Sequence, residues 1–451
     1  MHEAARNDSN AVPPPMPTFR EALVWWLKLG FVSFGGPAGQ IALMHQELVE
    51  RRRWISERRF LHALDYCMVL PGPEAQQLAT YIGWLMHRTR GGIVAGALFV
   101  LPSLAILVAL SWVYVTHGDV PAIAGAFYGI KPAVVAIVAF AGWRLASRAL
   151  VNGWLVAIAV LAFVAVALLH APFPLIVAAA AAVGFAGGRL RPSVFAMRSA
   201  HEAGAPRHAA AVIDDDTPTP PHARFSAARF TRILVVGLAI WSTAIVALTV
   251  AFGSDAVLTR MGWFFSQAAL LTFGGAYAVL PYVIEGAVEQ HQWLSAGQMI
   301  DGLALGESTP GPLIMVVAFI SFVGGWSHTV LGADAPFASG ALAAAVVTFF
   351  TFLPSFCFIL LGGPFVESTH GDLRFTAPLT AITAAVVGVI VNLALFFAWH
   401  VLWPRGFDGG FEWPAALIGV GAAVLLFALR VGVIAVIATS ALAGLAIRLL
   451  V

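Results

Sequence analysis

Residues 61–87 read LHALDYCMVLPGPEAQQLATYIGWLMH, an apolar stretch that Pro71-Gly72-Pro73 interrupts near its centre. Two prolines this close cannot lie inside a continuous α-helix, because each removes a backbone donor and clashes with the preceding turn, while glycine tolerates unusual dihedral angles. The helix must therefore break and leave N–H and C=O groups without partners. Inside a membrane, such backbone is tolerated only where protein or a water-filled cavity surrounds it.

The surroundings of this break have the composition of a membrane protein. The 451 residues are 60% hydrophobic and 11% charged, whereas soluble proteins contain about 25% charged residues. A water-soluble enzyme is therefore excluded, and the sequence predicts an all-α polytopic membrane protein. Long apolar segments, each near the roughly 20 residues that cross a bilayer, lie at 91–117, 122–143, 152–169, 172–187, 233–252, 340–363, 375–402, 412–429 and 431–450.

Other functional classes find no support in the composition. The net charge is only +2, so no nucleic-acid partner is expected. The two cysteines, Cys67 and Cys357, lie in apolar stretches and cannot build a disulfide framework. The thirteen histidines show no metal-ligand spacing, and the motifs of ATP-driven pumps and intramembrane hydrolases are absent from the sequence. We expect no metal, no cofactor and no enzymatic activity.

The break belongs to an internal repeat. At an offset of 239 residues, Phe34-Gly35-Gly36 recurs as Phe273-Gly274-Gly275, Trp54-Ile55-Ser56 as Trp293-Leu294-Ser295, and Pro71-Gly72-Pro73 as Pro310-Gly311-Pro312. After a 13-residue insertion, Leu101-Pro102-Ser103 recurs as Leu353-Pro354-Ser355. Such tandem duplication is typical of transporter folds. The predicted organisation is a disordered tail (1–18), a first repeat (19–187), an exposed cytoplasmic linker (188–231), an extra helix (232–256) and a second repeat (257–451).

Arginine placement predicts that the two repeats have opposite orientations. Residues 41–100 contain seven arginines, whereas the equivalent stretch 280–339 contains neither lysine nor arginine. By the positive-inside rule, the same loops face the cytoplasm in the first half and the outside in the second. An odd number of spans separates the halves whether the interrupted segments are re-entrant hairpins or full spans. We therefore expect an inverted repeat with the N-terminus inside and the C-terminus outside.

The broken helices are suited to an anion. Free helix N-termini carry partial positive charge, and glycine pairs allow a ligand to approach the backbone. One copy in each half predicts a site at their interface, although kinks and packing glycines are the alternative interpretation. The candidate binding residues are Gly35, Gly36, Pro71, Gly72, Pro73, Gly274, Gly275, Pro310, Gly311 and Pro312, with Gln76, Ser308 and Thr309 as neutral donors.

Charged residues within apolar segments extend the candidate site. Lys28 and Lys131 are the only lysines, and a charge at mid-bilayer costs at least about 2.5–3.5 kcal/mol. Lys131 is a candidate anion contact, with a structural pair to a carboxylate as the alternative, and Lys28 either takes part in gating or snorkels. The carboxylates beside the breaks are candidates for coupling or gating: Asp65, Glu74, Asp301 and Glu307. Glu74 would lie in the first turn of its half-helix, as a cap or a proton carrier.

The repeated motifs resemble those of the chromate ion transporter (CHR) family in its long, two-domain form. The resemblance rests on Phe34-Gly35-Gly36-Pro37, Trp54, Pro71-Gly72-Pro73 and Leu101-Pro102-Ser103, and on their second copies. It implies export of chromate, a tetrahedral oxyanion, across the bacterial inner membrane, which gives chromate resistance. The implied partners are the oxyanion and the lipid bilayer, and a homo-oligomer is left open.

Energetics narrows the mechanism that the resemblance implies. Moving a dianion out of a negative-inside cell gains roughly 4.6 kcal/mol per 100 mV, because each charge contributes about 2.3 kcal/mol. Export therefore needs no ATP, and proton exchange through Asp65 or Glu74 stays open. Two alternatives also stay open: an importer of sulfate or another oxyanion, and a sensor or scaffold that works through residues 188–231.

Overall fold

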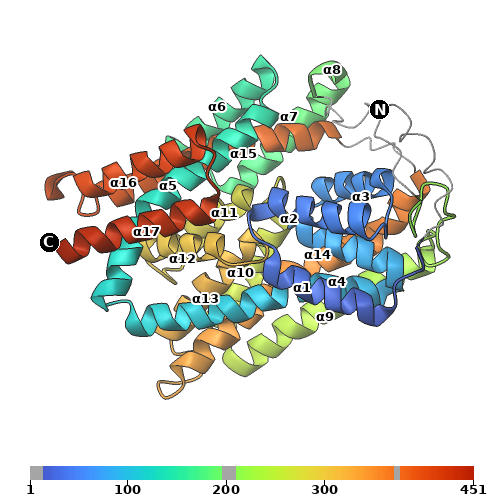
Figure 1. Cartoon of the computed structure of the whole chain (residues 1–451), viewed down its shortest axis with the longest axis horizontal. Helices are drawn as coiled ribbons and strands as arrows, with labels where there is room; N and C mark the ends of the chain where they lie inside the picture. The colour runs from blue at the N-terminus through green and yellow to red at the C-terminus, as the bar shows by residue number, and fades with distance from the viewer. Residues whose placement is uncertain (1–13, 196–209, 370–375, 451) are drawn as a thin grey trace, which may run out of the picture.

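The computed structural model describes residues 14–195, 210–369 and 376–450, and the regular elements among them are helices (Figure 1). Most of the predicted tail, 1–18, and part of the linker lie outside the described residues. The helices are α1 (Phe19–Val32), α2 (Gly36–His45), α3 (Glu57–Val69), α4 (Glu74–His117), α5 (Pro121–Ala149), α6 (Gly153–Ala167), α7 (Phe173–Leu190), α8 (Pro192–Phe195), α9 (Ala227–Phe252), α10 (Val257–Leu271), α11 (Ala276–Ile284), α12 (Ala296–Ser308), α13 (Val316–Ser327), α14 (Pro336–Thr369), α15 (Thr376–Leu402), α16 (Trp413–Ala423) and α17 (Val433–Leu450).

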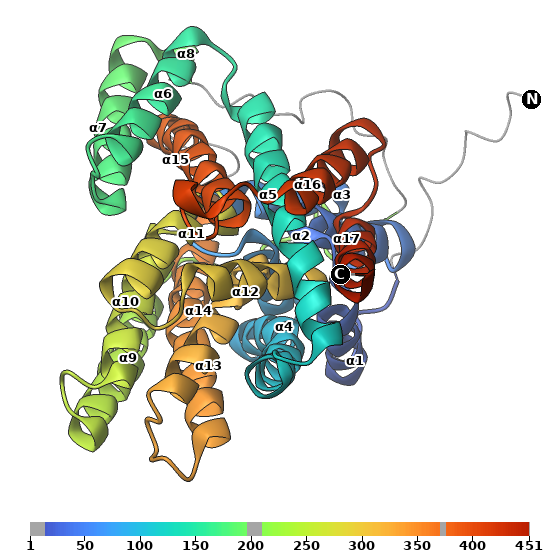
Figure 2. The ribbon, with the colours of Figure 1, turned by 90° about the vertical axis from the view of Figure 1, so that its left-hand side faces the viewer.

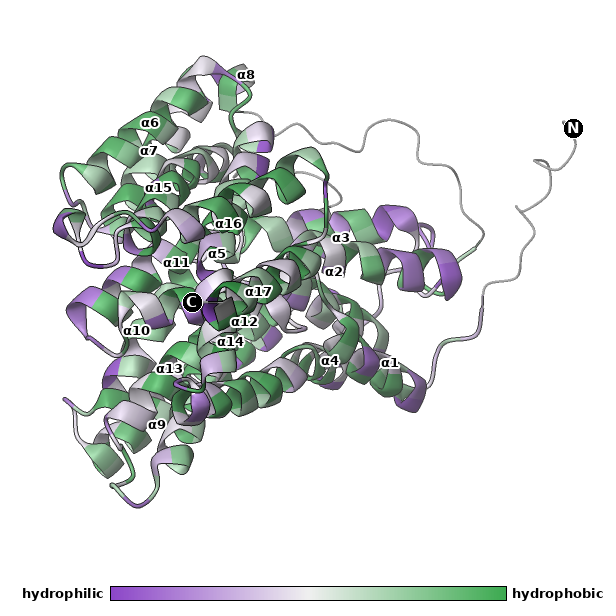
Figure 3. Cartoon of the chain, turned by 60° about the vertical axis from the view of Figure 1, so that its left-hand side comes forward, coloured by the Kyte–Doolittle hydropathy of each residue, from purple (hydrophilic) through white to green (hydrophobic). Residues whose placement is uncertain are grey.

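Six of the described helices are long and apolar enough to cross a membrane: α4, α5, α7, α9, α14 and α15. Hydrophobic residues cover the long helices, and hydrophilic residues gather at helix ends and in connections (Figure 3). The extra helix α9 is the most exposed of the six, with Val235 and Val250 58% and 82% exposed. The all-helical membrane class that the composition predicts is confirmed.

The helices end at the motifs that the sequence singles out as breaks. Between α1 and α2, Gly35 has φ +87°, and between α3 and α4, Gly72 has φ +131°. The second copies, Gly274 and Gly311, have φ +77° and +105°. Backbone in this region favours glycine, because a β-carbon would crowd the neighbouring carbonyl. The conformation of each break therefore explains why glycine occupies it in both halves.

The repeat extends to local details beyond the quoted motifs. A π-helical turn follows α2 at Gln46–Arg51, and another follows α11 at Glu285–Gln290, again 239 residues later. Ser56 and Ser295 cap α3 and α12 by accepting a hydrogen bond from the third backbone N–H of each helix. The halves differ after the Pro-Gly-Pro break, since α4 continues through a kink at His87 whereas α13 and α14 are separate helices.

The last helices of each half pack on the other half. Helix α5 of the first half packs on α16 and α17 of the second, and α15 of the second half packs on α6 and α7 of the first (Figure 2). Glycines permit these approaches: a β-carbon on Gly129 of α5 would lie 2.7 Å from the backbone nitrogen of Gly444 in α17. The two halves are therefore interlocked.

Within the predicted linker, residues 210–226, which lie between α8 and α9, are not exposed throughout. Ala211, Ile213 and Ala223 are buried, and Ile213 forms an isolated bridge with Ile55. The polar composition of residues 188–231 predicts an exposed connection, but these small and apolar residues are covered by the first half. The remainder of this segment lies partly outside the described residues.

Candidate functional site

The four breaks form two hydrogen-bonded pairs, each of which joins one half to the other. We call each pair a crossing, and the two crossings together the junction. The backbone N–H of Gly72 donates to the carbonyl of Thr272 at 2.7 Å, and the N–H of Gly311 donates to the carbonyl of Ser33 at 2.8 Å. Both pairs join one half to the other, and the offset of 239 residues converts the first pair into the second. The Pro-Gly-Pro break of each half is thus tied to the Phe-Gly-Gly break of the opposite half.

The two carbonyls that accept these hydrogen bonds belong to residues with hydroxyl side chains, Ser33 and Thr272. Ser33 and Thr272 follow the last residues of α1 and α10, and their hydroxyls donate to the carbonyls of Leu29 and Ala268 at 2.6 and 2.7 Å. Because the helix ends here, the cap carbonyl has lost the partner that a further turn would supply. It accepts instead from the opposite half. The sequence signal for these two residues is a hydroxyl directly before Phe-Gly-Gly in both copies.

The Leu-Pro-Ser motifs complete each crossing. A β-carbon on Gly311 would lie 2.6 Å from the β-carbon of Ser103, and one on Gly72 would collide with the hydroxyl of Ser355. The serine of each half therefore lies against the central glycine of the other half's Pro-Gly-Pro break. This contact gives a physical reason for both motifs to recur together.

The first half supplies most of the polar side chains at the crossings. The Gln40 amide donates to the carbonyl of Gly311 at 2.6 Å, and that of Gln77 donates to the carbonyl of Pro71 at 2.8 Å. The predicted donor Gln76 donates instead to the hydroxyl of Thr80 at 3.0 Å. All three glutamines are buried.

Several polar atoms of this junction have no hydrogen-bond partner among the described residues. They include the Oε1 atoms of Gln40, Gln76 and Gln77 and the hydroxyl of Ser103. A buried polar group without a partner is costly unless a ligand, water or another conformation satisfies it. At the positions equivalent to the glutamines, the second half carries Val279, Met315 and Val316, so the polar character is one-sided.

Two carboxylates lie beside the second Phe-Gly-Gly break. Glu74 is the first residue of α4, as the sequence predicts, and its Oε1 would lie 3.9 Å from a β-carbon on Gly275. The hydroxyl of Tyr277 donates to Glu307. Glu74 and Glu307 are both partly exposed, although they lie beside the breaks. The arrangement brings one acidic residue from each half to the start of α11.

Lys131 lies in an ion pair. Its ammonium is 3.3 Å from Oδ2 of Asp301, and the hydroxyl of Tyr114 donates to the same oxygen at 2.9 Å. The Asp301 side chain is 4% exposed and that of Lys131 34%. The described conformation thus contains the structural pair that the sequence left as an alternative to an anion contact. The pair joins α5 of the first half to α12 of the second.

The remaining candidates lie apart from the crossings or bond locally. The hydroxyls of Ser308 and Thr309 donate to the carbonyls of Leu305 and Gly306 at 3.0 and 3.1 Å, so neither is a free donor. Lys28 is exposed on α1, a position suited to snorkelling. Asp65 is partly buried on α3.

Comparisons with known proteins identify relatives of both halves. Residues 20–185 and 259–445 each match the family described as chromate transporter. A chromate transport protein of Pseudomonas aeruginosa is 33% identical over 388 residues, 85% of this chain and 81% of the relative. One of Cupriavidus metallidurans is 28% identical over 387 residues, 85% of this chain and 84% of the relative. An uncharacterised transporter, YwrB, of Bacillus subtilis matches over 141 residues, only 31% of this chain but 72% of the relative, at 27% identity. No solved structure matches the chain.

Proposed function

Because the chain belongs to the chromate transporter family, we propose that it exports chromate from the cytoplasm across the bacterial inner membrane. The relatives named for chromate transport align with 85% of the chain. The observation that carries a transport mechanism is the crossed pair of hydrogen bonds from Gly72 to Thr272 and from Gly311 to Ser33. These bonds bring broken helices of both halves to one junction, which is where transporters of duplicated architecture bind substrate.

The two halves have inverted topology in this proposal, with the N-terminus in the cytoplasm. The arginine-rich stretch 41–100 and its arginine-free equivalent 280–339 support this orientation. The segments that end at Phe-Gly-Gly and Pro-Gly-Pro are then re-entrant and reach mid-membrane depth from opposite sides. A tetrahedral oxyanion binds where they meet, close to the N-terminal ends of α4 and α11.

The residues proposed to bind the oxyanion come from both halves. Gly35, Gly36, Gly274 and Gly275 allow the anion to approach the backbone, and the two Pro-Gly-Pro breaks hold the helix ends apart. Gln76 and Ser103 provide buried polar groups. Lys131 contacts the anion when its pair with Asp301 opens, so the lysine changes partner during the transport cycle.

Membrane potential supplies the driving force in this proposal. Each 100 mV favours the outward movement of a dianion by roughly 4.6 kcal/mol, which corresponds to more than three decades of concentration ratio. The acidic residues Asp65, Glu74, Asp301 and Glu307 serve gating, with proton exchange as a secondary contribution. Transport rates and a reversal potential that ignore an imposed pH gradient would exclude the proton contribution.

The proposal is tested in chromate-sensitive bacteria that express the protein. We expect a lower intracellular chromate content and growth at chromate concentrations that stop the control cells. The matched control is Gly72→Ala brought to the same amount in the membrane, because a β-carbon at this position disturbs the crossing. Chromate content that rises on expression, and falls when sulfate competes, would indicate the alternative of an oxyanion importer instead.

A further inference from the structure

Residues 210–226, which we call the strap, lie across the connection between the π-helical turn and α3. The N–H of Val212 donates to the carbonyl of Arg53 at 2.9 Å, and the N–H of Ser56 donates to the carbonyl of Ile213 at 2.9 Å. Ile213 is 4% exposed and packs in the same apolar cluster as Trp54 and Ile55. The strap is therefore bound to the first half by its backbone and by a buried side chain.

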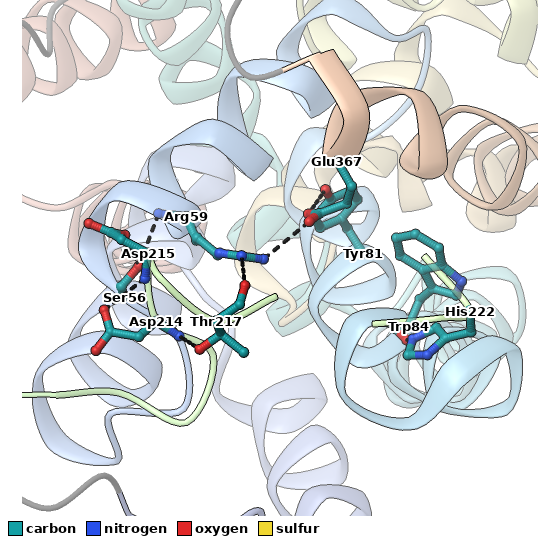
Figure 4. Close-up of polar contacts among 9 residues, drawn as sticks. All are labelled: Ser56, Arg59, Tyr81, Trp84, Asp214, Asp215, Thr217, His222 and Glu367. Atoms are coloured by element: carbon teal, nitrogen blue, oxygen red, sulfur yellow. Dashed lines mark hydrogen bonds and ion pairs between the residues drawn. The ribbon is translucent and has the colours of Figure 1, made fainter. Parts of the chain in front are cut away.

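Side-chain contacts anchor the strap at three further places (Figure 4). The hydroxyl of Ser56 donates to Oδ1 of Asp215 at 2.6 Å, and the guanidinium of Arg59 donates to the carbonyl of Thr217 at 2.5 Å. Farther along, the ring of His222 lies edge-on to Trp84 and bonds its backbone carbonyl at 3.0 Å. The anchors reach from the start of α3 to the first part of α4.

Arg59 also joins the two halves. Its guanidinium is 3.1 Å from Oε2 of Glu367, near the end of α14, and the hydroxyl of Tyr81 in α4 donates to Oε1 of the same carboxylate at 2.6 Å. We call these three residues the latch (Figure 4). The side chains of Arg59 and Glu367 are only 13% and 9% exposed. One guanidinium thus holds both the strap and the second half.

Behind the latch, α3 and α4 contact α14 closely. The hydroxyl of Tyr66 donates to the carbonyl of Phe358 at 3.0 Å and occupies the space beside Gly362. A β-carbon on Gly363 would lie 2.8 Å from the indole ring of Trp84. Cys67, the neighbour of Tyr66, is completely buried in the apolar cluster that α3 and α4 form with α14.

The repeat does not reproduce this arrangement in the opposite half. The residues equivalent to Arg59 and Glu367 are Gln298 and Val115, neither of which ionises, and Ile320 stands for Tyr81. An inherited packing contact would recur in both copies of a duplicated fold. The latch and strap therefore belong to one face of the molecule, the face where the linker lies.

We propose that the latch and the strap close the linker face of the transport pathway, and that this face opens only when Arg59 leaves Glu367 and the strap leaves Ser56. The inference rests on the proposed function, because it assumes a pathway between the halves. Since Arg59 binds both partners, release of the strap weakens the latch. In the proposed orientation this face is cytoplasmic, so the strap controls access of the substrate from the cell interior.

The test measures how fast a maleimide modifies Cys67 in the purified full-length protein, in a Cys357→Ser background. We expect Glu367→Gln and Asp215→Ala each to raise the rate by at least about tenfold, because a hydrogen bond to a charged group stabilises the closed form by this order. Tyr128→Phe, which removes a hydrogen bond to Glu412 between α5 and the residue before α16, is the matched control and should leave the rate unchanged.

An unchanged rate in both Glu367→Gln and Asp215→Ala would overturn the proposal, as would an equal rise in Tyr128→Phe. Asp215 is exposed on the strap, so its variant keeps the test valid if the Glu367 variant does not fold. The labelling needs no chromate. A raised rate in a protein that fails to move chromate would therefore support the latch while contradicting the proposed function.

Discussion

Gly72 and Gly311 show how single residues determine the junction. Each has a positive φ, donates its N–H to the opposite half and faces the serine of a Leu-Pro-Ser motif. The sequence identifies both glycines because Pro-Gly-Pro is conspicuous inside an apolar segment. The repeated hydroxyl before Phe-Gly-Gly marks Ser33 and Thr272 in the sequence, but it does not show that their carbonyls accept hydrogen bonds from the opposite half.

Gly72→Ala should destabilise the protein and abolish chromate transport. The positive φ alone costs about 1–3 kcal/mol for a residue with a side chain, and the added carbon would lie 2.5 Å from the amide nitrogen of Gln77. The measurement is the apparent Tm of the purified protein. Gly421→Ala is the control, since nothing lies within 4 Å of a β-carbon there, and its Tm should stay the same or rise. Equal Tm values for the two variants would contradict the role of Gly72.

The pair between Lys131 and Asp301 can be separated into a structural and a substrate-binding role. Asp301→Asn should lower the Tm, but by less than the loss of about 3–5 kcal/mol expected for a fully buried pair, because the Lys131 side chain that remains is 34% exposed. The exchange of both residues, K131D with D301K, should restore the Tm but not transport, because the cation then lies on α12 instead of α5. Full recovery of transport in the exchanged protein would show that Lys131 has only a structural role.

The sequence predicts the charged candidates of the site less completely than the breaks. Lys131 and the four carboxylates are conspicuous because charges are rare in apolar segments, yet the sequence does not indicate which carboxylate pairs with Lys131. In the sequence, Arg59 is indistinguishable from the other arginines of its cluster. Its partner Glu367 is 308 residues away, so the chain gives no local sign of the pair. Ser308 and Thr309 carry the right chemistry for free donors, but carbonyls of their own helix engage their hydroxyls.

At the level of helices, apolar length and the break motifs predict most of the bounds. Each of the nine long apolar segments overlaps a helix, and 91–117, 122–143, 233–252 and 340–363 lie entirely within one. The Phe-Gly-Gly and Pro-Gly-Pro motifs separate α1 from α2, α3 from α4, α10 from α11 and α12 from α13. The π-helical turns at Gln46–Arg51 and Glu285–Gln290 were not predicted. Their sequences continue an ordinary helical pattern, and the widened turn depends on tertiary packing.

The packing of α15 on α6 gives a prediction for the interlocked helices. A β-carbon on Gly388 would meet the carbonyl of Ala159 and lie 2.9 Å from the backbone nitrogen of Phe163. Gly388→Ala should therefore lower the Tm, although alanine in a helix is intrinsically favoured by about 1 kcal/mol. Gly421→Ala, again the control, keeps the intrinsic gain without the collision. A Tm that rises equally in both variants would show that α15 and α6 do not approach this closely.

Across the whole molecule, the exchange of late helices unites the two repeats. Because α5 packs with α16 and α17 while α15 packs with α6 and α7, neither half buries its own last helices. The duplication itself is visible in the sequence, but this exchange is not, since equivalent helices have similar apolar faces and pairing within one half satisfies the same pattern. The proposed path between the halves would therefore be lined by both copies.

The most direct test of the account is potential-driven uptake of chromate into inside-out vesicles that contain the protein. With a potential positive inside the vesicle, we predict accumulation of labelled chromate that increases with the potential and disappears in Gly72→Ala. The same vesicles without an imposed potential provide the control. No accumulation under any imposed gradient, from protein shown to be folded, would contradict export by membrane potential through the junction of the two halves.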